Sequence, residues 1–156
     1  MADGDPHDRI WLRNLGSCEI VAGALVLDFR NSKGKIVIDT AYGGIGTKDP
    51  MPVEVETGNI TVRPVADGDR EIVVLIGSIA PNGTAVVTLD FDNDASGWFT
   101  QRVSILDADV AGTFARFETP NELTSGVFET QAKLDLPIPE DACKKERNAP
   151  STVPVS

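Results

Sequence analysis

Histidine, basic residues and long apolar runs are scarce in this chain, and each shortage excludes a class of function. The single histidine, His7, cannot build a serine–histidine–aspartate triad or a histidine-rich metal centre. Lysine and arginine total 14 against 24 acidic residues, and the resulting net charge of −10 opposes binding to nucleic acid. No apolar run reaches the roughly 18 residues that a membrane-spanning helix needs. The chain also shows no signal peptide, and its start is typical of a mature N-terminus preceded by an added methionine.

Cysteine occurs only twice, as Cys18 and Cys143 near opposite ends of the chain. Neither belongs to a C-x-x-C pair, so a redox or zinc motif is excluded. The two residues could form one disulfide that closes almost the whole chain, which would stabilise the fold by about 4–5 kcal/mol. The alternative is two separate buried thiols. A disulfide favours an extracellular or periplasmic protein.

The 156 residues suit one domain, and turn residues divide the chain into short β-type runs. Strict alternation over Val53–Glu56 predicts a strand with one buried face, and apolar residues throughout Glu71–Ile79 predict a central strand. About nine or ten strands and no convincing helix predict an all-β fold, an antiparallel β-sandwich over residues 1–136. Residues 137–156 read as a Pro/Ser/Thr-containing tail, flexible unless Cys143 anchors it. The expected strands span residues 8–14, 18–29, 35–40, 53–56, 60–65, 71–79, 85–91, 98–105, 110–118 and 127–136.

An acidic cluster follows one of these strands, at Asp90, Asp92, Asn93 and Asp94. Strand alternation places Phe91 inward with Leu89 and puts Asp90 and Asp92 on the other face, about 7 Å apart. Crowded oxygen ligands at a strand end suit calcium, although an acidic solvated turn is the alternative. An EF-hand is excluded because Ala95 and Gln101 replace its required glycine and glutamate. Further calcium ligands are expected from Asp67, Asp69 or Asp28.

Other candidate sites carry weaker signals. Asn59 and Asn82 each begin an N-glycosylation sequon at an expected turn. Trp11 and Trp98 suit either a glycan platform or a core or sheet-edge position. Glu54 and Glu56 share one strand face and could serve a glycosidase, but aromatic residues make up only 6% of the chain, which argues against a sugar cleft. We therefore expect a protein that is not an enzyme.

Short segments spread over residues 6–118 resemble the Wreath-type core domain of sponge aggregation factors and its secreted bacterial relatives. They occur in the order and spacing of that family. The resemblance implies an extracellular adhesion module that binds copies of itself in a calcium-dependent way and often carries glycan. It also implies a calcium-linked role for Asp90, Asp92 and Asn93, while residues after Pro137 depart from the pattern. The segments are Pro6–Ile10, Asn14–Cys18, Leu27–Phe29, Ile36–Thr40, Gly43–Gly46, Asp67–Asp69, Ala80–Gly83, Leu89–Asp92 and Asp109–Phe114.

The sequence thus predicts a secreted adhesion or matrix module that self-associates with calcium as its cofactor. Calcium would neutralise carboxylates and let two acidic copies meet despite their charge. The alternative is a glycan-binding module that acts without calcium, with an acidic glycan as a further partner. Nucleic acid is not expected as a partner, and no membrane span is expected.

Overall fold

The computed structural model describes residues 8–40, 52–93, 111–129 and 133–144. These ranges contain ten strands, one short 3-10 helix and no α-helix, which confirms the predicted all-β fold. Within them, no helix is long and apolar enough to cross a membrane. The elements are β1 (Asp8–Arg13), β2 (Ala24–Asp28), β3 (Ile36–Ile38), β4 (Glu54–Thr57), β5 (Asn59–Val62), β6 (Glu71–Ser78), β7 (Thr84–Leu89), β8 (Phe91–Asn93), β9 (Phe114–Glu118), β10 (Leu123–Val127) and the helix η2 (Glu140–Ala142).

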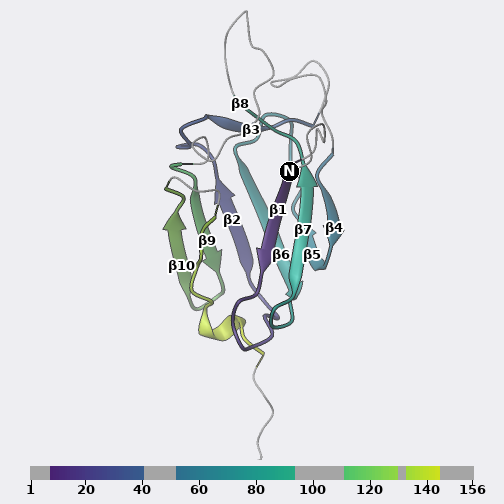
Figure 1. Cartoon of the computed structure of the whole chain (residues 1–156), viewed down its shortest axis with the longest axis vertical. Coiled ribbons are helices and arrows are strands. Elements are labelled where there is room, and N and C mark those ends of the chain that lie inside the picture. The colour runs from purple at the N-terminus through teal and green to yellow at the C-terminus, as the bar shows by residue number, and fades with distance from the viewer. Residues whose placement is uncertain (1–7, 41–51, 94–110, 130–132, 145–156) are drawn as a thin grey trace, which may run out of the picture.

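The strands form two antiparallel sheets that face each other as a β-sandwich (Figure 1). One sheet has five strands in the order β10-β9-β2-β6-β5, and the other has three in the order β1-β7-β4. A small antiparallel pair, β3 with β8, lies at the top of the view, and η2 lies at the bottom. Because the second sheet is two strands narrower, it covers only part of the first.

Strand alternation explains the core between the sheets. In β1, Ile10 points inward and is buried, whereas Trp11 points outward and is 66% exposed. In β6, Ile72, Val74 and Ile76 are buried at alternate positions, and the intervening residues are partly exposed. Apolar side chains that alternate in this way bury one face of each sheet against the other.

The chain crosses between the sheets at a tight corner after β4. Gly58 adopts a φ of +104°, and a Cβ at this position would lie 2.7 Å from the Cβ of Ala85. A side chain therefore has neither the conformation nor the space it would need there. Glycine lets the chain leave the edge of the three-stranded sheet and enter the edge of the five-stranded sheet as β5.

Two sequence expectations about strands are wrong in detail. All four residues of β4 are exposed, including Val55 at 39%, because β4 is an edge strand with a bulge after Val55. The strand expected at residues 127–136 is instead β10 at Leu123–Val127. The expected strand at 98–105 lies outside the described residues.

The segment 133–138, here the C-terminal strap, runs alongside β9 and β10 towards η2 (Figure 1) and packs against the inner side of the five-stranded sheet. Leu134, Leu136 and Ile138 pack against the core. The hydroxyl of Thr124 in β10 donates a 2.7 Å hydrogen bond to the carbonyl of Pro137. The packed part of the chain therefore continues beyond residue 136, through η2 to Lys144, whose N–H donates to the carbonyl of Glu19.

Candidate functional site

Three of the predicted calcium ligands lie near one another around residues Ile38–Thr40, at the end of the sandwich that we name the acidic pole. The N–H of Asp39 donates to the carbonyl of Asp90 at 2.9 Å, which extends the β3–β8 ladder by one residue pair. The N–H of Thr40 donates to Oδ1 of Asp67 at 2.8 Å. The N–H of Ile38 donates to the carbonyl of Asp69 at 2.9 Å. Asp67, Asp69 and Asp90 thus reach the same short stretch of chain.

Two carboxylates at the acidic pole are buried opposite each other. Asp39 is fully buried and Asp90 is 6% exposed. The register pairs Ile38 with Phe91, so Asp39 and Asp90 face the same side of the ladder. The burial of Asp90 argues against the alternative of a solvated acidic turn at this residue, because Asp90 lies between β7 and β8 with its side chain in the interior. Residues directly opposite in a ladder have Cβ atoms about 5 Å apart, and like charges at that separation repel.

The other predicted ligands are less informative. Asp28, which closes β2, accepts a bidentate ion pair from Arg30 with Nη2–Oδ2 at 2.7 Å, and these hydrogen bonds hold the pKa of Asp28 below its usual value. Only the backbone of Asp92 and Asn93 is described, and Asp94 lies outside the described residues. In the described ranges, no three His, Cys, Asp or Glu side chains form a group that could hold a metal ion.

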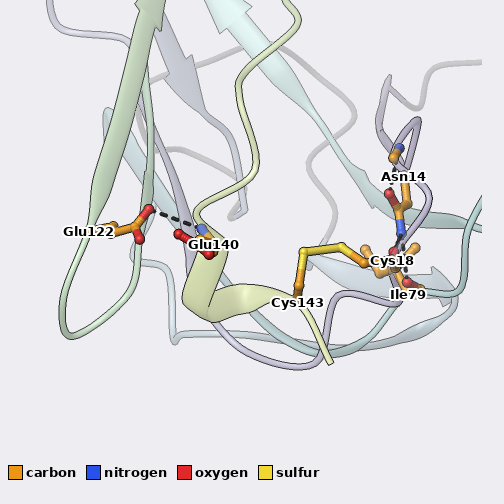
Figure 2. Close-up of a disulfide and its surroundings, with 7 residues drawn as sticks. Asn14, Cys18, Ile79, Glu122, Glu140 and Cys143 are labelled. Carbon is orange, nitrogen blue, oxygen red and sulfur yellow. Dashed lines mark hydrogen bonds between the residues drawn. A yellow bond between two sulfur atoms is a disulfide. The ribbon is translucent and has the colours of Figure 1, made fainter. Parts of the chain in front are cut away.

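A disulfide joins Cys18 and Cys143 at the opposite end of the sandwich, which confirms the predicted pairing (Figure 2). It fastens the residues after η2 to the start of the chain, where Ile20 forms β-bridges with both Ile79 and Cys143. The hydroxyl of Thr119 donates a short hydrogen bond to Asp141 in η2, and this bond lowers the pKa of the Asp141 carboxyl.

Asn14 is 1% exposed and connects the disulfide loop to the segment between β6 and β7 (Figure 2). Its Nδ2 donates to the carbonyls of Cys18 at 2.7 Å and Ile79 at 3.0 Å. Its Oδ1 accepts from the N–H of Gly16 at 2.9 Å. A buried amide with all these partners has a structural role at this end of the sandwich.

An apolar groove of about 160 Å³ lies between β1 and the C-terminal strap. Leu25, Ile76 and Phe117 of the five-stranded sheet form its floor. Trp11 and Leu15 stand at its mouth, exposed by 66% and 61%. A cavity of roughly 150 Å³ lined by aliphatic and aromatic side chains binds a benzene-sized molecule, so the groove has room for one or two apolar side chains. Arg13, Asn14 and Asp135 also line the groove, and its remaining apolar walls are Leu12, Ile20, Ile79, Leu134, Leu136 and Ile138.

Basic and aromatic side chains alternate along the outer side of β1. Arg9, Trp11 and Arg13 are all exposed, while Ile10 is buried and Leu12 is half-buried between them. Nε of Arg9 lies 2.8 Å from Oε2 of Glu56, so this ion pair spans the middle strand β7. The candidate hydrolase carboxylate Glu56 also accepts a hydrogen bond from the Thr88 hydroxyl at 3.1 Å.

The two predicted glycosylation sites are both exposed. Asn59 opens β5, and its Nδ2 donates to the hydroxyl of Ser78 at 3.0 Å. Asn82 lies in the turn before β7 with a φ of +61°. Trp98, the second candidate glycan platform, lies outside the described residues, so Trp11 is the candidate whose position is known.

Three features of these sites were not predicted from the sequence. Asp39 belongs to the acidic pole, and its signal was its place directly after the apolar run at residues 36–38. Arg9, Trp11 and Arg13 share one side of β1, and their signal was charged and aromatic residues at every second position. The strap was mistaken for a strand because Leu134 and Leu136 alternate with Asp135. No protein family, characterised protein or solved structure matches the chain significantly, so these sites are interpreted from their own chemistry.

Proposed function

We propose that this chain is an extracellular-type adhesion module that binds copies of itself in a calcium-dependent way. The disulfide supports an oxidising compartment, since such bonds rarely persist in a reducing cytosol. A surface with net charge −10 keeps copies apart unless a cation or a complementary surface brings them together. The Wreath-type resemblance supports the same role.

The acidic pole is the observation that carries the calcium part of the proposal. The register holds Asp39 beside Asp90, and the loop with Asp67 contacts the next residue, Thr40. Hard oxygen ligands from neighbouring carboxylates and carbonyls are those that calcium prefers. The carboxylates of Asp39 and Asp90 would contact the ion, and Asp67 would fix the neighbouring residue Thr40 through its hydrogen bond. Bound there, calcium would reduce the repulsion between buried carboxylates and stiffen the loops that meet a second copy.

A calcium titration tests the proposal. Thermal melting and static light scattering are measured on the full chain in millimolar calcium and again after adding EDTA. We expect calcium to raise both the melting temperature and the mean particle mass, because an ion that binds only the folded state stabilises it by mass action. The variant Asp67→Asn should lose the response, and Glu54→Gln, which removes a carboxylate from the β4 edge, should keep it. Melting and mass that do not change with calcium would refute the calcium dependence.

Anionic glycan binding without calcium is a second candidate, favoured by the outer side of β1. Trp11 offers an exposed indole, and Arg9 and Arg13 flank it at strand spacing of about 7 Å. This arrangement can stack a sugar ring and pair with its carboxylates. In EDTA, alginate should change the tryptophan fluorescence, whereas neutral dextran should not. The change should disappear in Trp11→Phe, and a response that survives this variant would contradict the assignment.

A further inference from the structure

At Trp11 and Arg13, strand β1 has no backbone hydrogen bond on the side away from β7 within the described part of the chain. It lies at the edge of its sheet, with β7 on its other side. The N–H of Asn14 donates to the carbonyl of Gly83 just before β7, so this residue points toward β7. Backbone groups alternate sides along a strand. Those of Leu12 therefore also point toward β7, and those of Trp11 and Arg13 face the apolar groove.

The C-terminal strap lies across the groove from β1 but does not complete the sheet. No backbone hydrogen bond joins residues 133–138 to β1, although both segments are within the described ranges. A Cβ on Gly126 of β10 would lie 3.1 Å from Leu136 and 3.2 Å from Leu134, so the strap packs flat under β10. Pro137 and Pro139 have no N–H, which prevents a regular ladder along the lower strap. One additional strand could therefore fit between β1 and the strap, above the apolar side chains of the groove.

The outer edge of β1 is recessed, and this recess restricts which kinds of polypeptide can pair with it. The strap, β9 and β10 all extend past β1 on the side of the groove (Figure 1). The edge of another folded sheet would collide with the strap before its backbone reached β1. A single extended peptide has no neighbouring strands and could enter. The same recess protects β1 from the edge-to-edge pairing that leads to aggregation.

We propose that the groove binds one extended peptide segment of another protein chain, by strand addition to β1. One or two apolar residues at alternate positions would fill the groove above Leu25, Ile76 and Phe117. The intervening residues would point outward beside Trp11 and Arg13. Arg13 is exposed and has no ion pair in the described part of the chain, whereas Arg9 is bound to Glu56, so a carboxylate at an outward position complements Arg13. The preferred segment alternates apolar and acidic residues, and its binding does not need calcium.

The test uses a blocked synthetic heptapeptide in which valine and glutamate alternate, titrated into the full chain in EDTA by calorimetry. We expect saturable binding and slower amide hydrogen exchange at Trp11 and Arg13. Two further peptides carry N-methyl groups on all valine amides or on all glutamate amides. Because only one edge of the peptide can pair with β1, one of these should lose about tenfold or more in affinity and the other much less. Equal affinity of the two methylated peptides would overturn strand addition.

Charge reversal at the groove gives an independent readout. Arg13→Glu should lower the affinity for the valine–glutamate peptide by about threefold to fivefold, as expected for the loss of an exposed ion pair. The same variant should raise the affinity for a valine–lysine peptide. Arg63→Glu, the same change at an exposed residue after β5, should leave both affinities unchanged. The absence of saturable binding at millimolar peptide would overturn the proposal. Residues 145–156 could instead protect the Trp11 and Arg13 amides in the absence of peptide. That result would also overturn the proposal, because the groove would then hold the chain's own tail.

Discussion

Replacing both cysteines, in the variant Cys18→Ala with Cys143→Ala, should remove the largest single constraint on the unfolded chain. The disulfide joins residues 125 positions apart. In the chain-entropy account, the cost of closing a loop grows with the logarithm of its length, and a loop of this length corresponds to about 5 kcal/mol at room temperature. That is a large part of the roughly 5–15 kcal/mol by which domains are usually stable. The variant should therefore melt roughly 10–20 °C below the disulfide-bonded protein.

The assay is urea unfolding followed by circular dichroism, on the parent protein with and without dithiothreitol and on the variant. The reduced parent and the variant should have the same midpoint, and dithiothreitol should have no effect on the variant. Hydrogen exchange should show the first loss of protection at Ala142–Lys144, whose backbone hydrogen bonds to Glu19 and Val21 depend on the bridge for their position. A loss of less than about 1 kcal/mol would refute the reasoning. It would mean that the ends of the chain stay together in the unfolded state or that packing of the strap suffices.

Two further predictions concern single side chains. Asn14→Ala removes two donated hydrogen bonds and one accepted one in a buried site, and should cost about 2–4 kcal/mol in urea unfolding, whereas exposed Asn121→Ala should cost less than about 1 kcal/mol. The pKa of Asp28 is lowered mainly by its hydrogen bonds from Arg30, so its contribution to stability is complete above the unfolded-state pKa near 4 and is lost as the pH falls through the lower folded-state pKa. Asp28→Asn should therefore flatten the loss of stability in acid, and an unchanged pH profile would contradict this.

Local sequence patterns predicted most strands because the core of a sandwich imposes an alternation of two residues. The strand around Val87 shows that alternation, the strand around Val74 is apolar throughout, and the structure places both residues in the core. The same rule failed at Leu134–Leu136, where alternation occurs without a ladder because prolines follow and β10 lies above. It also failed for β4, since alternation cannot tell an edge strand from an inner one.

The candidate sites depended on contacts that no local pattern contains. The loop at residues 67–69, one of the two sources expected for further calcium ligands, lies near Asp90 because both bond to residues 38–40. The burial of Asp90 was missed, since it arises from the change of direction between β7 and β8. The groove could not be predicted because it forms only when the strap lies in the layer of the narrower sheet. That position depends on the disulfide and on the number of strands in each sheet, and the number of strands per sheet cannot be read from the sequence.

The position of the disulfide also determines how the molecule would carry mechanical load. Strand β1, which begins at Asp8, starts near the top of the sandwich, and η2, which Cys143 follows, lies at its bottom (Figure 1). Tension between Asp8 and Lys144 would pass through the covalent bridge and would not stretch the chain between Cys18 and Cys143. Only β1 lies outside the closed loop, and it would be pulled along its own axis against β7, so that its interstrand bonds share the force. A tethered copy would therefore yield first at β1 while the rest of the sandwich stays intact.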